Sequence, residues 1–486
     1  MRWILYNVLF AIAYAAMMPK FLLRMKKRGG YRAHFAERFG RYDPGTARRL
    51  AEKPRVWVHA VSVGEANLAG QVLAELRRRD PAASFVLSTT SSTGRAVCER
   101  LVGPDDVCVY LPLDFPPCVR RALRAANVRA MVLVEAELWP NLLRALHRRG
   151  VPLLLANGRI SDRSAPGYRR LRFFFGPVLR LFDALLVQSE LDRGRLLAAG
   201  APADRTRVTG SIKFDVAPPA PEKIARARET LACAGIAPGA GCGGASPPGE
   251  PRRLGGDASP HQDRTSPCGP VLLGGSTWPG EELALARAWR DALPACPDAR
   301  LVLVPRHFER AAEVADELES AGFRVLRRSQ AAEPPAGRTV ARSDGRTVER
   351  SDGVTVRPCD RETILLVDTT GELFALYALA DLVFVGKTLA PNEGGQNMIE
   401  PASLGRATLV GPHTENFKPA MEVFRREGAV LEVPDADALS REVSRLLSDA
   451  SARAALGARA SAAVAGSRGA LARTCDAIES VLSSRS

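Results

Sequence analysis

Two blocks in which short apolar segments alternate with longer amphipathic ones constrain the fold of this 486-residue chain more than any other feature. The short segments are rich in Val, Leu and Ile, as buried strands are. In the longer segments apolar residues recur every three or four positions, as on one face of a helix. Strands that alternate with helices form parallel sheets with helices on both faces. We therefore predict an α/β fold, and the length favours two domains rather than one core.

The predicted strands are apolar runs that end in a turn. They lie at residues 56–61, 84–87, 107–111, 130–134, 152–155 and 184–187 in the first block, and at 271–273, 301–304, 363–367, 382–385 and 407–410 in the second. Between the blocks, residues 235–270 are loaded with Gly, Pro, Ser and Ala, which cannot bury a core. An eight-residue polar repeat over 337–357 is typical of a surface loop.

These patterns divide the chain into five predicted segments. They are an anchor over 1–24, a first Rossmann-like domain over 25–215, a linker with a disordered Gly/Pro-rich insertion over 216–269, a second Rossmann-like domain over 270–470, and a C-terminal helix and tail over 471–486.

The N-terminal residues 3–19 are almost wholly apolar, and five basic residues lie between Lys20 and Arg28. The run is slightly shorter than the roughly 20 residues that span a bilayer, and no small-residue cleavage site follows it. This favours an uncleaved membrane anchor helix, crossing the bilayer or lying in its face, and a buried N-terminal helix is the alternative. By the positive-inside rule, the basic residues place the rest of the chain in the cytoplasm.

A formal net charge of +15 indicates anionic partners, such as lipid headgroups, phosphorylated substrates or nucleic acid. The nine cysteines include no C-x-x-C pair, which favours a reducing cytoplasm over a disulfide scaffold or a zinc site. The six histidines do not cluster, and neither H-E-x-x-H nor a G-x-G-x-x-G after a strand occurs. We therefore expect no bound metal and no redox cofactor.

Glu65 lies in the first turn of a helix that follows the strand at 56–61. Open α/β sheets bind ligands outside the carboxyl ends of their strands, and a helix N-terminus favours an ionised carboxylate. This position suits a general base. The alternative is that Glu65 only complements the helix dipole.

Three further charged residues follow strands of the first block. Glu135 and Glu137 stand where the strand at 130–134 ends and a helix begins, and alternation puts both carboxylates on one side. Lys213 lies at the end of the first domain, where its cation suits a phosphate or a developing negative charge. The alternatives are acidic residues that serve a helix start and a lysine that is only solvated.

In the second block three turns lead from a strand into a helix. They are Pro305-Arg306-His307, Gly371-Glu372-Leu373 and Asn397-Met398-Ile399-Glu400. Glycines let a ligand approach the backbone, free N–H groups at helix starts bind phosphate, and an acidic residue can hold ribose hydroxyls. Together these turns predict a nucleotide pocket. Gly386-Lys387-Thr388 is similar to the end of a P-loop, but Asp381 occupies the place of the first glycine, which excludes that motif.

The motifs SVGE, E-x-ELWPN, SxKFD, VPRH, TxGEL, N-x-x-E after a glycine pair, and GPHTENFK occur in this order. In this the chain resembles the 3-deoxy-D-manno-octulosonic acid (Kdo) transferases of lipopolysaccharide synthesis, over roughly residues 1–470 apart from 235–270 and 337–357. The resemblance implies a GT-B type glycosyltransferase, with two Rossmann-like domains facing a cleft and an N-terminal anchor. It also implies that Kdo moves from CMP-Kdo to the tetraacylated lipid A precursor (lipid IVA), without a metal, on the cytoplasmic face of the inner membrane.

The resemblance also implies roles for individual residues. Glu65 is similar to the family's proton acceptor, and Glu135 and Lys213 to positions that stabilise the transition state. The residues that resemble its CMP contacts are Pro305, Arg306, Gly371, Glu372, Leu373, Asn397, Met398, Ile399 and Glu400. The first domain is then the acceptor domain and the second the CMP-sugar-binding domain. Lys387 departs from the family's glycine-rich stretch.

The residues also suit an inverting transfer. A base deprotonates the acceptor hydroxyl, which attacks the anomeric carbon from the face opposite the leaving CMP, and this attack inverts that carbon. We expect the acceptor's phosphates near 20–41 or near the Arg169-Arg170-Arg172 cluster, and no nucleic-acid partner. One alternative is another nucleotide-sugar transferase or epimerase of the same fold. A second is a catalytically inactive membrane-surface protein that holds anionic lipid.

Overall fold

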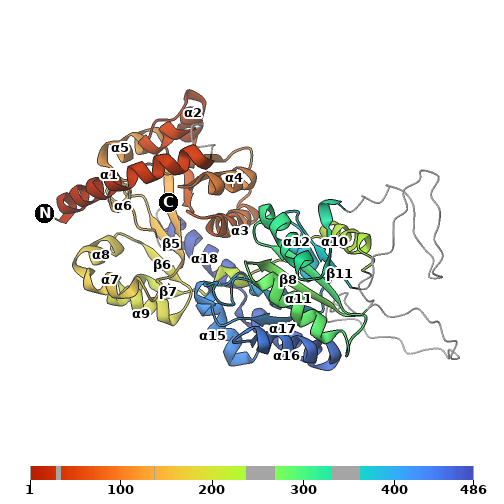
Figure 1. Ribbon diagram of the computed structural model, residues 1–486. Coiled ribbons are helices and arrows are strands. Elements are labelled where there is room, and N and C mark those ends of the chain that lie inside the picture. The colour runs from red at the N-terminus through yellow and green to blue at the C-terminus, as the bar shows by residue number, and fades with distance from the viewer. Residues whose placement is uncertain (1, 29–33, 136, 237–268, 331–361, 485–486) are drawn as a thin grey trace. The chain divides into compact units, whose positions relative to one another are not determined.

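The computed structural model describes residues 2–28, 34–135, 137–236, 269–330 and 362–484. The chain forms two compact units, each containing a seven-stranded parallel sheet (Figure 1). Residues Met1–Asp215 and Ser467–Ser486 make up the N-terminal unit, and Val216–Gly466 make up the C-terminal unit.

In the N-terminal unit the strand order is β3-β2-β1-β4-β5-β6-β7. The strands are β1 (Arg55–His59), β2 (Phe85–Thr89), β3 (Val107–Tyr110), β4 (Val128–Val134), β5 (Leu153–Gly158), β6 (Ala184–Val187) and β7 (Thr206–Val208). Neighbouring residues of β1 point to opposite faces of the sheet, so Trp57 enters one apolar core and Val58 the other. Both faces are buried, which explains why the strands are apolar throughout.

The helices of this unit cover both faces of its sheet (Figure 1). They are α1 (Arg2–Arg28), α2 (Pro44–Glu52), α3 (Val63–Arg79), α4 (Ser92–Leu101), α5 (Pro116–Ala125), α6 (Pro140–His147), α7 (Ala165–Arg170), α8 (Arg172–Leu179), α9 (Glu190–Ala198), α18 (Ala470–Ser483) and the short 3-10 helices η1 (Phe35–Phe39), η2 (Ala203–Arg205) and η3 (Ile212–Phe214).

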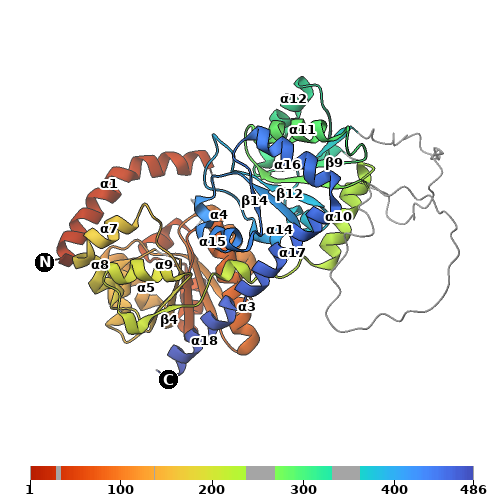
Figure 2. The same cartoon turned by 90° about the horizontal axis from the view of Figure 1, so that it is seen from below.

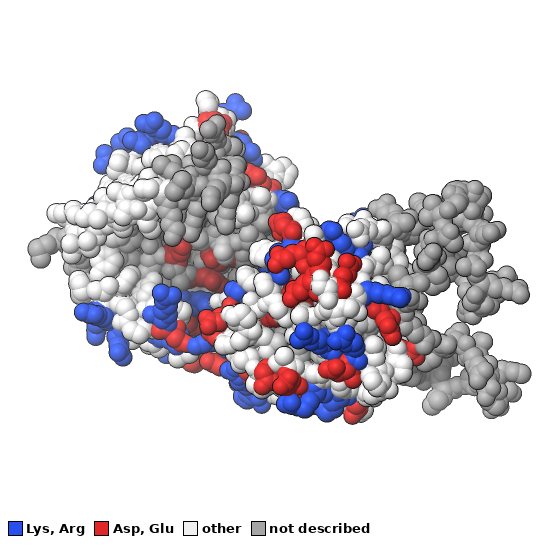
Figure 3. All heavy atoms as spheres, in the orientation of Figure 1, with Lys and Arg blue, Asp and Glu red and all other residues white. Residues whose placement is uncertain are grey.

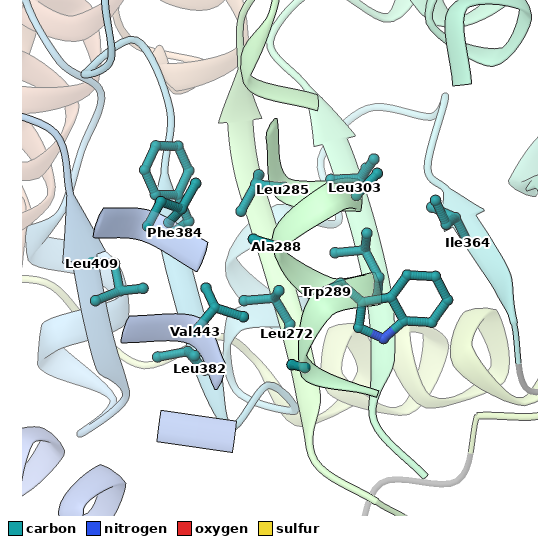
Figure 4. Packing of buried hydrophobic residues seen from close by; sticks show 14 of the residues in the cluster. Leu272, Leu285, Ala288, Trp289, Leu303, Ile364, Leu382, Phe384, Leu409 and Val443 are labelled. Carbon is teal, nitrogen blue, oxygen red and sulfur yellow. The ribbon is translucent and has the colours of Figure 1, made fainter. Parts of the chain in front are cut away.

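In the C-terminal unit the strand order is β10-β11-β9-β8-β12-β13-β14. The strands are β8 (Val271–Thr277), β9 (Arg300–Pro305), β10 (Arg324–Arg327), β11 (Thr363–Leu366), β12 (Leu382–Val385), β13 (Ala407–Val410) and β14 (Leu431–Glu432). The helices are α10 (Pro221–Cys233), α11 (Glu281–Ala292), α12 (Ala311–Ser320), α13 (Leu373–Tyr377), α14 (Ile399–Ser403), α15 (Lys418–Glu427), α16 (Ala436–Ser448), α17 (Ala450–Ser467) and the 3-10 helices η5 (Phe308–Arg310), η6 (Arg328–Gln330) and η7 (Glu415–Phe417). Figure 4 shows Leu272 and Phe384 of the sheet packed in one core with Trp289 of α11 and Val443 of α16.

One face of the N-terminal helix α1 packs against the rest of its unit. The Tyr6 hydroxyl donates to Oδ2 of Asp114 at 2.8 Å, and the ring of Phe10 lies 5.0 Å from that of Phe115. The opposite face exposes Ile4, Leu5, Val8, Leu9, Ile12 and Met17, and this surface is largely free of charge in Figure 3. Among the described residues no helix has the length and the hydropathy needed to cross a membrane. The structure therefore gives no support to a spanning anchor over 1–24.

Two segments belong to units other than the sequence boundaries predict. Helix α10 lies in the C-terminal unit, although 216–269 was expected to be a linker. Helix α18 lies beside α3 in the N-terminal unit (Figure 2), although the C-terminal helix and tail over 471–486 were expected as a segment separate from the first domain. Both differences arise because distant residues bury these helices, and helical periodicity does not identify its partner. Residues 237–268 and the 337–357 repeat lie outside the described residues, so their assignments stay predictions.

Candidate functional site

Glu65 and Glu135 lie at the point where the strand order of the first sheet reverses. Strand β1 stands between β2 and β4, because the chain adds β2 and β3 on one side and then returns to add β4 on the other. At such a switch point the loops beyond the two strands diverge and leave a crevice at the carboxyl edge. Glu65 follows β1 and Glu135 follows β4.

The Glu65 carboxylate is held within the first turn of α3. Its Oε2 accepts a hydrogen bond from the Val61 N–H at 2.9 Å, and its Oε1 accepts one from the Ser62 hydroxyl at 2.8 Å. Ser62 in turn accepts from the Glu65 N–H at 3.3 Å, which makes a reciprocal cap. The residue therefore does serve the helix start. It also keeps capacity for a further proton, because a carboxylate offers about four lone-pair sites.

The surroundings of Glu65 increase its affinity for a proton. Burial raises the pKa of this carboxyl, the hydrogen bonds from Val61 and Ser62 oppose the rise, and the negative charge of Glu135 adds to it. A base with a raised pKa accepts a proton more readily at neutral pH than an ordinary glutamate.

Glu135 and Lys213 form an ion pair in the same unit. The Lys213 Nζ lies 2.9 Å from Oε1 of Glu135, and both side chains are mostly buried. Lys213 is carried by η3, and Glu135 adopts a left-handed backbone with φ of 66° while its N–H donates to the Ala156 carbonyl. A left-handed glutamate is uncommon and marks a position that the surrounding structure holds in place.

Glu137 belongs to the same charged group. The sequence analysis identified this residue but assigned it no catalytic role. Burial raises the pKa of Glu137 to about 7, and the charge of Glu65 contributes to the rise. Tyr168 lies close enough for the charge of Glu137 to raise its pKa, after the larger effect of burial. The N-terminal unit thus brings Glu65, Glu135, Glu137 and Lys213 into one electrostatic environment.

The C-terminal unit has a second switch point, between β8 and β12, and the predicted nucleotide contacts surround it. Arg306 is exposed just beyond β9, and its N–H donates to the Thr277 carbonyl at 3.0 Å. The neighbouring Pro305 is buried. The loop after β9 is therefore tied to the end of β8.

The turn at Gly371 and Glu372 is fixed by threonines. Gly371 has φ of 88°, which favours glycine. Oε2 of Glu372 accepts from the Thr230 hydroxyl at 2.7 Å, and Oε1 accepts from the Thr369 hydroxyl. Leu373 begins α13 directly after this turn.

The segment from Asn397 to Glu400 opens α14. The Asn397 amide donates to Oε1 of Glu400 at 3.0 Å and its oxygen accepts from the Ile399 N–H at 3.1 Å. Burial raises the pKa of Glu400, and the Asn397 hydrogen bond opposes the rise. Met398 and Ile399 have core side chains, so only their main chain is available to a ligand.

Glu281 organises this edge, and the sequence analysis did not identify it. Its carboxylate is 1% exposed and accepts from the N–H groups of Trp278, Lys387, Thr388 and Leu389 at 2.8–3.0 Å. The amides of the loop after β12 therefore hold a carboxylate of the protein itself. The signal was present, because Gly280-Glu281 follows a buried strand and opens a helix as Gly64-Glu65 does.

In the part of the chain that the structure describes, no group of three or more His, Cys, Asp or Glu side chains is arranged to hold a metal ion. The expectation of a reaction without a metal stays a prediction.

The chain is similar to known proteins of one family. A family model described as 3-deoxy-D-manno-octulosonic-acid transferase (kdotransferase) matches residues 33–216. The 3-deoxy-D-manno-octulosonic acid transferase of Bordetella pertussis is 34% identical over 465 residues, 94% of each chain. That of Haemophilus influenzae is 29% identical over 453 residues, 93% of this chain and 92% of the relative.

Among solved structures, a glycosyltransferase from Rickettsia africae is 12% identical and has a TM-score of 0.53, covering 89% of this chain and 98% of its own. This likeness shows the fold, two parallel-sheet α/β units of the GT-B type. Similarity over nearly the full length of the Bordetella relative then identifies the family: the chain belongs to the 3-deoxy-D-manno-octulosonic acid transferases, which are glycosyltransferases.

Proposed function

We propose that the protein transfers Kdo from CMP-Kdo to the lipid A precursor lipid IVA in lipopolysaccharide core biosynthesis, with inversion at the anomeric carbon and without a metal. The observation that carries the proposal is the group formed by Glu65, Glu135 and Lys213 at the switch point of the N-terminal unit, in a chain of the Kdo transferase family. A carboxylate with raised pKa beside an ion-paired lysine is suited to deprotonating a hydroxyl.

In the proposed step Glu65 takes the proton of the acceptor hydroxyl. The acceptor oxygen forms a bond to the anomeric carbon of Kdo while the bond from that carbon to the CMP phosphate breaks. The electron pair of the broken bond leaves with CMP, and the proton remains on Glu65 until solvent removes it.

Lys213 counters negative charge that develops during transfer. Glu135 holds the Lys213 ammonium by an ion pair of 2.9 Å, so the cation needs little reorganisation when the reaction occurs. Arg306 lies exposed among the predicted CMP contacts, where its guanidinium suits the phosphate of the leaving group. Either cation can supply positive charge of the kind for which other transferases use a divalent ion.

The exposed apolar face of α1 supports contact with a membrane surface, which the proposed function places at the cytoplasmic face of the inner membrane. Among the α1 side chains that the structure describes, six large apolar ones are exposed, with Ile4 at 70%, and Phe173 of α8 is 62% exposed. The ring of Tyr6 stacks on Phe174 of α8, so the two helices are neighbours. An amphipathic helix of this kind lies in the plane of the membrane with its apolar face among the acyl chains.

The proposal is tested with purified protein, CMP-Kdo and lipid IVA, with the product measured by mass spectrometry and released CMP measured in parallel. Addition of Kdo with equal release of CMP is expected. Turnover of a UDP-sugar in place of CMP-Kdo would instead favour another transferase or an epimerase of this fold. Binding of lipid IVA without release of CMP would favour an inactive lipid-binding protein.

A further inference from the structure

Lys387 adopts a backbone conformation that lysine rarely takes. It follows β12 at the switch point of the C-terminal unit and has φ of 63°. For an L-residue other than glycine this left-handed conformation is strained. Such outliers persist where the surrounding structure holds them, and they cluster at ligand sites.

The surrounding hydrogen bonds hold Lys387 in this conformation from both sides. Its N–H donates to Oε2 of Glu281 at 2.8 Å, and the next two N–H groups donate to Oε1 of the same carboxylate. The Lys387 carbonyl accepts from the Gly395 N–H at 2.9 Å. The direction in which the side chain leaves the loop is therefore determined by the fold.

The Lys387 ammonium lies over an aromatic ring. Its Nζ is 4.8 Å from the centre of the Trp278 ring, and the His307 ring also contacts that ring, with 5.4 Å between the ring centres. A side chain added at Gly394 would place its Cβ 3.4 Å from Nζ. Among the residues that the structure describes, no carboxylate forms an ion pair with Lys387. The loops after β8, β9 and β12 thus present a positive charge with which no described carboxylate forms a direct ion pair.

We propose that Lys387 binds an oxyanion of the sugar-nucleotide donor and contributes to its selection. The inference rests on the proposed function, and CMP-Kdo carries two such groups, the phosphate and the carboxylate of the sugar. Trp278 keeps the ammonium in place before the donor arrives, because the face of an indole ring attracts a cation. A lysine that only packed on Trp278 would leave donor binding unchanged when removed.

The variant Lys387→Gly separates the charge from the backbone, because glycine accepts the left-handed conformation without strain. Lys387→Arg keeps a cation, and Lys223→Ala on the exposed surface of α10 serves as the control. The Michaelis constants for CMP-Kdo and lipid IVA are measured, together with the dissociation constants of CMP and cytidine by calorimetry. Circular dichroism reports whether each variant is folded.

Lys387→Gly is expected to raise the Michaelis constant for CMP-Kdo about tenfold or more, the effect of losing one hydrogen bond to a charged group, and Lys387→Arg is expected to restore part of it. The constant for lipid IVA and that of the control stay at their wild-type values. If the phosphate is the partner, Lys387→Gly also weakens CMP but not cytidine. If the carboxylate is the partner, CMP affinity does not change.

The inference is overturned if folded Lys387→Gly retains the wild-type constants for both CMP-Kdo and CMP. This outcome differs from failure of the proposed function, in which the wild-type protein itself transfers no Kdo. The CMP and cytidine measurements remain informative in either case, because they do not depend on transfer.

Discussion

The ammonium nitrogen of Lys213 lies 2.9 Å from Oε1 of Glu135, although the two residues are 78 positions apart in the chain. The pair joins the loop after β4 to η3, at the edge where Glu65 also stands. A cation held in this way is positioned before substrate binds, and such preorganisation is a large contribution to the stabilisation of charged transition states.

Lys213→Ala is expected to lower kcat for Kdo transfer about 10²–10³-fold, because it removes a preorganised charge. Lys213→Arg is expected to retain more activity than the alanine variant. Steady-state kinetics with CMP-Kdo and lipid IVA provide the measurement. A kcat for folded Lys213→Ala within about twofold of the wild-type value would contradict a role in the transition state.

Glu65→Gln is expected to reduce transfer at least about 10²-fold, because the amide cannot take the proton. Glu190→Gln, an exposed glutamate at the start of α9, is the matched control and should retain activity. Mass-spectrometric product yield gives the comparison. Near-normal turnover of Glu65→Gln would remove Glu65 as the base.

The pH profile gives a separate test of Glu65. The base must be ionised, and burial followed by the charge of Glu135 holds its pKa above the ordinary value of 4.5. Activity should therefore fall as pH decreases through this raised pKa. In Glu135→Gln the residual activity should lose its acid limb at a lower pH, because one of the causes of the rise is gone. An unchanged limb would show that the two carboxylates do not interact.

Glu137→Gln tests the burial of an acid with a raised pKa. The folded-state pKa is about 7 against an ordinary value of 4.5, so the stability that the protonated form contributes is complete below about pH 4.5 and is lost as pH rises through about 7. The glutamine variant stays neutral. Its melting temperature relative to wild type should therefore rise between about pH 5 and about pH 8. A difference that does not depend on pH would refute this account.

Asp215→Ala is expected to loosen α18 from the N-terminal unit. The Asp215 carboxylate accepts from the Gly469 and Leu471 N–H groups at 2.6 and 2.7 Å, as a helix cap does. Loss of a cap costs about 0.5–2 kcal/mol of stability. Thermal unfolding and limited proteolysis near residue 468 give the readout, with exposed Asp437→Ala as control. Equal melting temperatures and equal cleavage of the two variants would contradict the prediction.

The double variant Leu5→Asp, Leu9→Asp is expected to weaken binding to vesicles that contain phosphatidylglycerol, because two charges enter the exposed apolar face of α1. Val208→Asp places a charge at another exposed apolar residue of the same unit and should bind as wild type. Cosedimentation measures the bound fraction. Equal sedimentation of the wild-type protein and the double variant would argue against an interfacial α1.

Acceptor binding should also weaken at high salt, because exposed charges are screened beyond about 8–10 Å at moderate ionic strength.

The sequence by itself determined the α/β class, the two blocks and the strands with strong apolar runs, including β1, β4, β8 and β12. It also placed Glu65 and Glu135 at the ends of their strands. The periodicity of apolar residues predicts these features because it indicates which face of an element is buried. It missed β7, β10 and β14, which are short, lie toward the sheet edges and have partly exposed side chains.

Only the tertiary structure decided which segments meet. Sheet order places β1 beside β4 and β8 beside β12, which creates the two switch points. It also joins Lys213 to Glu135, α18 to the N-terminal unit, and the Glu281 carboxylate to three amides more than 100 residues away. These contacts depend on how distant elements pack. The sequence pattern within one segment does not indicate which distant residue will form hydrogen bonds or ion pairs with its polar groups.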